Sequence, residues 1–171
     1  MPRLSLSRIG VPVILSLVLA TAAVGGPPWI AIEYPPNPHD AGTRGALLTV
    51  RTYHHGDLVS YDLTGTAEGL VNGKRVSAPL DIRRLSTAGT FAVRWKKPDN
   101  GTWVLVISSR RDGQHAATAV VTIDGAGRVA GVTVPSDPIE GGRWQVPRRV
   151  GSNEIDAMLR GSAAVATRNT R

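Results

Sequence analysis

The residues of this 171-residue chain that could best hold a metal are the adjacent histidines His54 and His55. Imidazole nitrogens bind zinc and copper, and His39 is a further candidate ligand upstream. Neighbouring residues of a strand face opposite ways, so His54 and His55 can share a metal only at a bulge or in the turn before Gly56. The spacing leaves two alternatives open: a metal site of His54 and His55 with further ligands among His39, His115, Asp40 and Asp57, or a polar strand end that enters a loop.

Four arginines form a second candidate site, of a kind that attracts anions. They stand as two pairs, Arg83-Arg84 and Arg110-Arg111, each near the end of a predicted strand. Counting along an antiparallel meander places both pairs at the same end, where they could attract lipid head groups, envelope polymers or an acidic protein. The alternative is that charges at strand ends maintain solubility and discourage edge pairing. Nucleic acid is not an expected partner, because few aromatic residues are available for base stacking.

No catalytic motif appears in the sequence. The chain lacks G-x-S-x-G, H-E-x-x-H and P-loop patterns, and it has no cysteine that could act as a nucleophile. Glu33 and Glu68 lie far apart in the chain, and nothing marks them as an acid–base pair. We therefore expect a protein that is not an enzyme and that carries no cofactor.

The four tryptophans could offer a surface on which sugars stack. Trp95 and Trp103 lie in strands with inward alternation, so we expect both in the core. Trp29 and Trp144 lie in segments flanked by Pro and Gly, and they are the candidates for exposed aromatic side chains.

The first 22 residues predict a cleavable signal peptide. Arg3 and Arg8 precede an apolar run over 9–19, and the small-x-small sequence at 20–22 suits cleavage after Ala22. A membrane anchor is the alternative, but the run is shorter than the roughly 20 apolar residues that span a bilayer. Loss of its two arginines lowers the formal net charge from +7 to +5. We expect a secreted or periplasmic protein with no stable membrane span after processing.

The chain over 27–150 predicts one all-β domain. Apolar and polar residues alternate in several segments, and 102–109 is apolar on both faces, as a central strand would be. Asn72-Gly73 supplies the positive φ angles of a type I′ hairpin. The predicted strands are 29–34, 46–54, 75–83, 90–96, 102–109, 116–123 and 129–134. Short strands at this spacing indicate an antiparallel sandwich or barrel.

Residues 151–171 predict a short helix and a flexible tail. Asn153 can cap the helix with Asp156 at the third position, and Gly161 is expected to end or weaken it. The apolar stripe of this helix consists of Ile155, Met158 and Leu159.

Three glycine-led motifs suggest a family. They are Gly65-Thr66-Ala67, Gly89-Thr90-Phe91 and Gly101-Thr102-Trp103-Val104-Leu105-Val106. On these residues, 65–122 resembles the bacterial periplasmic Ig-type sandwiches of the YtkA-like and copper-resistance CopC-like kind. The resemblance implies an antiparallel Ig-like β-sandwich in which the tryptophan of the last motif packs between the sheets.

These patterns lead to one preferred function and one alternative. We expect an exported, non-catalytic binding or accessory module of the cell envelope, whose partner is an anionic envelope component or protein. The alternative is a periplasmic metal-binding protein of the copper type that uses His54 and His55.

Overall fold

The structure is a computed structural model that describes residues 28–112, 115–139 and 145–168, the side chains of 163–168 excepted. One sheet contains β1 (Trp29–Glu33), β2 (Leu48–His54), β3 (Asp57–Leu58), β6 (Asp81–Arg84) and β7 (Thr90–Arg94). The other contains β4 (Asp62–Val71), β5 (Lys74–Pro79), β8 (Thr102–Arg110), β9 (Ala116–Ile123) and β10 (Val129–Thr133). The remaining elements are the 3-10 helix η1 (Ala41–Thr43), the paired strands β11 (Ser136–Pro138) and β12 (Gln145–Pro147), and the helix α1 (Ser152–Arg168).

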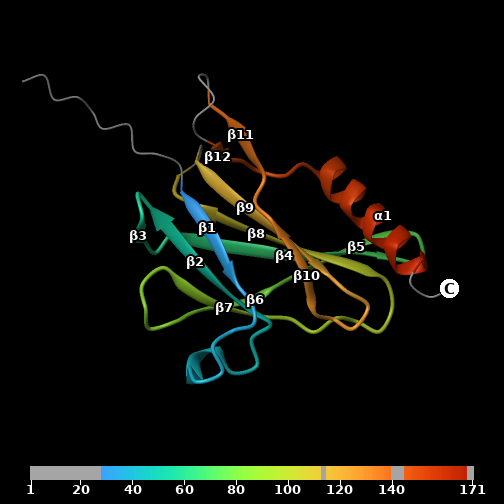
Figure 1. Ribbon diagram of the computed structural model, residues 1–171, viewed down its shortest axis with the longest axis horizontal. Coiled ribbons are helices and arrows are strands. Elements are labelled where there is room, and N and C mark those ends of the chain that lie inside the picture. Colours follow the sequence, from blue (N-terminus) through green and yellow to red (C-terminus); the bar gives the residue numbers. More distant parts are fainter. Residues whose placement is uncertain (1–27, 113–114, 140–144, 169–171) are drawn as a thin grey trace, which may run out of the picture.

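The strand order is that of an immunoglobulin-like sandwich. In the first sheet it is β1-β2-β7-β6, which corresponds to the A-B-E-D sheet of such domains (Figure 1). In the second it is β10-β9-β8-β4-β5, in which β9, β8, β4 and β5 take the places of G, F, C and C′. All strand pairs are antiparallel. The predicted fold class, an antiparallel Ig-like sandwich with a C-terminal helix, is confirmed.

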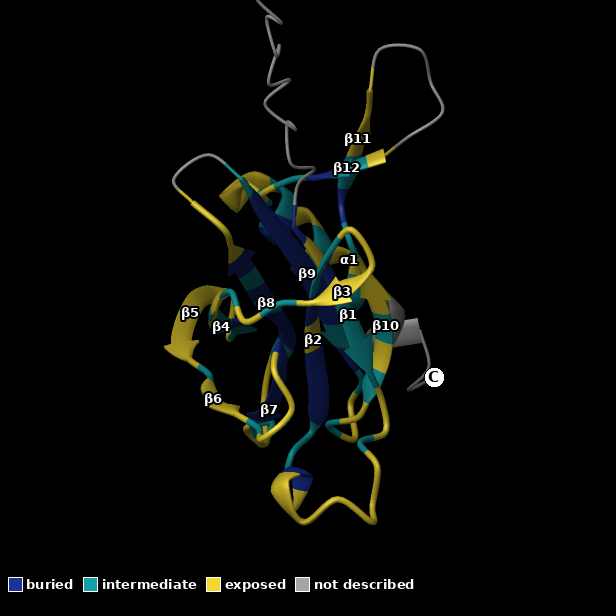
Figure 2. Cartoon of the chain, turned by 90° about the vertical axis from the view of Figure 1, so that its left-hand side faces the viewer, coloured by how far each residue is buried: buried dark blue, intermediate teal, exposed yellow. Residues whose placement is uncertain are grey.

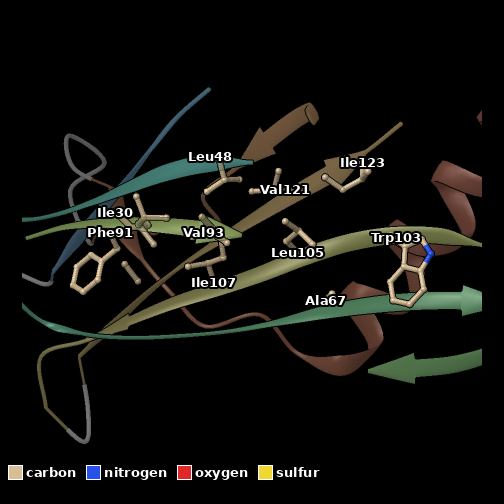
Figure 3. Packing of buried hydrophobic residues seen from close by; sticks show 13 residues of the cluster. Ile30, Leu48, Ala67, Phe91, Val93, Trp103, Leu105, Ile107, Val121 and Ile123 are labelled. Carbon is tan, nitrogen blue, oxygen red and sulfur yellow. The ribbon is translucent and has the colours of Figure 1, made fainter. Parts of the chain in front are cut away.

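Alternate side chains of the two sheets fill the space between them. Leu48 and Val50 of β2 face Leu105 and Ile107 of β8 in one buried cluster. Trp103 lies at one end of this cluster and Phe91 at the other (Figure 3). Burying an aliphatic or phenyl side chain of this size contributes about 1.5–3 kcal/mol, so this core is the main source of stability.

The predicted strand 75–83 is divided between the two sheets. β5 lies at the edge of the second sheet, β6 lies at the edge of the first, and Leu80 stands between them. The amide of Leu80 donates to the carbonyl of Gly65 at 3.1 Å, which holds the crossing point. Both edge strands are largely exposed (Figure 2). The prediction of one strand was wrong because polar and apolar residues keep alternating through the crossing.

The longest strand, β4, was not predicted as a strand, because two glycines weaken its apolar alternation. One of them, Gly69, lies under the indole of Trp103. A Cβ atom at Gly69 would lie 2.7 Å from ring carbons of Trp103, so only glycine leaves room for the indole. Gly69 therefore has two effects: it weakens the strand pattern in the sequence, and it leaves the space that the Trp103 indole occupies.

Helix α1 begins and ends at positions other than those predicted. Its cap is formed by Gly151 and Glu154, since the Glu154 carboxylate accepts a hydrogen bond from the Gly151 amide at 3.0 Å. The predicted cap of Asn153 and Asp156 was therefore wrong. The helix also continues beyond Gly161, because one glycine lowers helix stability by only about 1 kcal/mol.

The helix packs on the outer side of the second sheet (Figure 1). Ile155 and Leu159 contact Val104 of β8 and Val120 of β9, with Met158 beside them, so the predicted apolar stripe does pack on the domain. Within the described part of the chain, no helix is both long and apolar enough to cross a membrane.

Candidate functional site

Arg84 and Arg110 line one pocket at the edge of the sandwich. This pocket has a volume of about 440 Å³ and is called the edge pocket below. It forms where β6 passes the start of β4, because β5 pairs with β4 only from Thr66 onward. Its other lining residues are Asp62, Leu63, Thr64, Ile82 and Phe91.

Arg84 is held by an aromatic ring. It pairs in register with Phe91 across β6 and β7, so both side chains project from the same face of the sheet. The guanidinium carbon of Arg84 lies 5.3 Å from the centroid of the Phe91 ring, which is within the range of a cation–π contact. Arg84 itself is exposed, and a cation–π contact at an exposed site contributes about 0.5–1 kcal/mol, so the buried Phe91 ring favours this position of the arginine beside the pocket.

Arg110 reaches the same pocket from the second sheet. It is the last residue of β8 and pairs in register with Asp62 of β4. Among the described residues, neither Arg84 nor Arg110 forms an ion pair, and Asp62 makes none with either of them. The edge pocket thus has two arginines with no described ion pair among its lining residues, next to the apolar residues Leu63, Ile82 and Phe91. Guanidinium groups bind carboxylate and phosphate through paired, charge-assisted hydrogen bonds.

The structure separates the other two predicted arginines from this pocket. Arg83 alternates with Arg84 along β6, its side chain is 66% exposed, and its Nε donates to Asp81 Oδ1 at 3.1 Å. Arg111 lies beside His54, with 3.1 Å between its Nη1 and His54 Nε2. Of the four predicted arginines, the structure brings Arg84 and Arg110 together.

His54 is the last residue of β2, and His55 begins the hairpin turn to β3. His55 has a φ of 53°, which turns the chain so that the two rings stack at 4.1 Å between centroids. His39 belongs to the loop that precedes η1, where its amide donates to Asn37 Oδ1. Within residues 28–112, 115–139 and 145–162, no three His, Asp or Glu side chains are grouped so that they could hold a metal ion.

The tryptophans divide as their spacing predicts, as far as they are described. Trp103 is 6% exposed, and its Nε1 donates to the carbonyl of Asn100 at 2.9 Å. Trp95 packs against it, with 5.6 Å between ring centroids. Trp29 is exposed. Trp144 lies outside the described residues, as does the predicted signal peptide at 1–22.

Glu68 belongs to a hydrogen-bond network that the sequence did not predict. Burial acts to raise the pKa of Glu68, but hydrogen bonds from Thr66, Ser77 and Arg75 together lower it, so the group stays ionised. Arg75 also bonds to Asp156 of α1, which links the helix to the sheet. The charged groups of Glu68, Arg75 and Asp156 are thus already paired with one another, and their network holds helix α1 against the sheet.

Comparison of the chain with models of protein families, with curated proteins and with solved structures finds no match. The site is therefore interpreted from its own geometry.

Proposed function

We propose that this protein is an exported, non-catalytic binding module of the cell envelope that holds an anionic group in the edge pocket. The observation that carries the proposal is the presence of Arg84 and Arg110 in one pocket, without an ion pair to any described carboxylate. Export rests on the predicted signal peptide over residues 1–22.

Arg84 and Arg110 bring two positive charges to the edge pocket. Like charges in one pocket repel each other, and an anion between them replaces that repulsion with attraction. Hydrogen bonds to charged groups contribute about 1.5–3 kcal/mol each, which exceeds the value of an exposed ion pair. The Phe91 ring already orders Arg84, so less side-chain entropy is lost when the anion binds.

The preferred anion is a carboxylate or phosphate group carried by an envelope component. A protein with a net charge of +5 after processing is attracted to anionic envelope polymers at long range, and the edge pocket supplies the short-range contact. The apolar side chains of Leu63, Ile82 and Phe91 add contact area for the carbon atoms next to the charged group.

The test compares two double variants that remove the same charge. Purified wild-type protein, Arg84→Gln/Arg110→Gln and Arg83→Gln/Arg160→Gln are each incubated with isolated envelope material over a series of salt concentrations. Wild-type retention should fall as salt rises, because exposed charges more than about 8 Å apart are largely screened at physiological salt. The first double variant should lose retention at low salt, and the second should keep it.

Equal loss in both double variants would show that retention depends on net charge alone. Unchanged retention in the first variant would show that the edge pocket holds no anion. Either result would overturn the proposal.

A further inference from the structure

A second pocket, larger than the edge pocket, lies under helix α1 on the outer side of the second sheet. It has a volume of about 560 Å³, within the range of about 300–1,000 Å³ that small-molecule sites occupy, and is called the helix pocket below. Met158, Gly161 and Ser162 of α1 form one wall. Thr102, Thr122 and Ala130, from the adjoining ends of β8, β9 and β10, lie opposite. Figure 1 shows the helix lying along this sheet.

The helix pocket exists because small residues stand where larger ones would fill it. A Cβ atom at either Gly161 or Gly125 would meet no heavy atom within 4 Å, so both glycines border open space. Thr122 donates its hydroxyl to the carbonyl of Gly131 at 3.2 Å, which leaves its methyl group as its contact surface. With Ile123 and Met158 in the lining, the interior is mainly apolar.

Two charged residues border the helix pocket, and one of them is already satisfied. Asp124 accepts hydrogen bonds from the amides of Ala126 and Arg128, and it forms an ion pair with the Arg128 side chain. Lys97 donates to the carbonyl of Pro98 at 2.9 Å, and among the described residues it has no carboxylate partner. The charge left for a ligand is therefore the ammonium group of Lys97.

We propose that the helix pocket binds a single-chain anionic amphiphile, with the alkyl chain under α1 and the anionic head on Lys97. An apolar interior takes the chain, and the lysine at the border gives the ligand its orientation. Free fatty acids and lysophospholipids share this chemistry. The proposal does not depend on the anion held in the edge pocket.

The test measures displacement of a fluorescent fatty acid from the purified protein by palmitate, hexadecanol and lysophosphatidylglycerol. Wild-type protein should bind palmitate or lysophosphatidylglycerol saturably, and the stronger competitor identifies the source of the ligand. Hexadecanol should compete less well, because it lacks the charge that Lys97 recognises. The double variant Arg84→Gln/Arg110→Gln should bind as wild type does, which separates this site from the edge pocket.

Matched variants locate the binding. Gly161→Phe and Gly125→Phe place a ring into the helix pocket from opposite walls, and each should abolish saturable binding. Asn153→Phe adds the same ring at an exposed position about two turns before Gly161, outside the pocket lining, and should leave binding unchanged. Lys97→Gln should reduce palmitate affinity to that of hexadecanol, whereas Lys96→Gln should not.

Two results would overturn the proposal. The first is a lack of saturable displacement by any of the three amphiphiles in wild-type protein. The second is binding that survives both glycine variants while circular dichroism shows that they are folded.

Discussion

Trp103 is fixed on three sides at its end of the core. Its ring lies over Gly69, packs against Trp95, and is tied by its Nε1 to the carbonyl of Asn100. The indole therefore has no direction in which to move away from an added atom at Gly69.

Gly69→Ala should destabilise the protein by about 1–3 kcal/mol, the usual cost of overpacking a core. Gly125→Ala is the control, since its Cβ would point into open space, and we expect a change within about 0.5 kcal/mol. Urea unfolding of both variants measures the difference. Equal stability of the two would mean that the tryptophan does not lie against β4 as described.

The positions of Arg84 and Arg110 show which part of the edge pocket could be predicted from the sequence. Counting along antiparallel strands places Arg84 and Arg110 at one end of the sandwich, and both line the edge pocket there. Alternation alone assigns Arg110 to the sheet face that carries Val104 and Val106, away from the face of Phe91. Both arginines can line one pocket because β5 pairs with β4 only from Thr66 onward, which leaves the start of β4 open beside β6. The sequence pattern does not show where this pairing begins.

At the scale of elements, helix α1 is held by polar contacts as well as by its apolar stripe. Arg148 binds both carboxylate oxygens of Glu154 at 2.7 and 2.9 Å and also pairs with Asp137. The hydrogen bonds from Arg148, followed by the one from the Gly151 amide, lower the pKa of Glu154 to about 2. The ionised carboxylate thus stabilises the start of the helix.

The stabilisation from Glu154 should depend on pH in a defined window. A carboxyl whose pKa is lowered on folding from 4.5 to about 2 stabilises the protein above pH 4.5, and this contribution is lost as the pH falls toward 2. Glu154→Gln should therefore have a lower Tm than wild type at neutral pH, and the two Tm values should converge as the pH approaches 2. Thermal melts across this range test the expectation, and a difference that stays constant with pH would argue against it.

Elements with a strong local pattern were the ones the sequence predicted well. Strands such as β8 and β9 carry continuous apolar runs between turn residues, and their predicted bounds match the structure closely. β4 was missed because Gly65 and Gly69 replace core side chains where other residues approach closely. The division of 75–83 was missed because changing sheets leaves the alternation of side chains intact. In both cases tertiary packing determined the extent of the strand, and the local pattern of apolar residues does not show that packing.

The function of the whole molecule depends on whether the protein is exported. Export determines which partners can reach the edge pocket. The apolar run and the small-x-small sequence predict that the mature protein begins at Ala23, with Gly26 as the alternative start. Intact-mass analysis of the protein recovered from the exported fraction measures this directly. Recovery of the chain with Met1 intact in the membrane fraction would identify the segment as an anchor.

The two proposed binding sites lie in different parts of the whole molecule. Phe91 lines the edge pocket and Ile123 lines the helix pocket, and these two side chains lie toward opposite ends of the core cluster in Figure 3. Because the sites do not share lining residues, variants in one should leave binding at the other unchanged.

NMR of the arginine side chains shows directly whether the edge pocket binds an anion. The Nε–Hε signals of Arg84 and Arg110, assigned from their Gln variants, are followed while inorganic phosphate is added at constant ionic strength. We expect these two signals to shift together and saturate, while those of Arg83 and Arg160 stay near their starting positions. Small, unsaturated shifts spread evenly over all four arginines would contradict it.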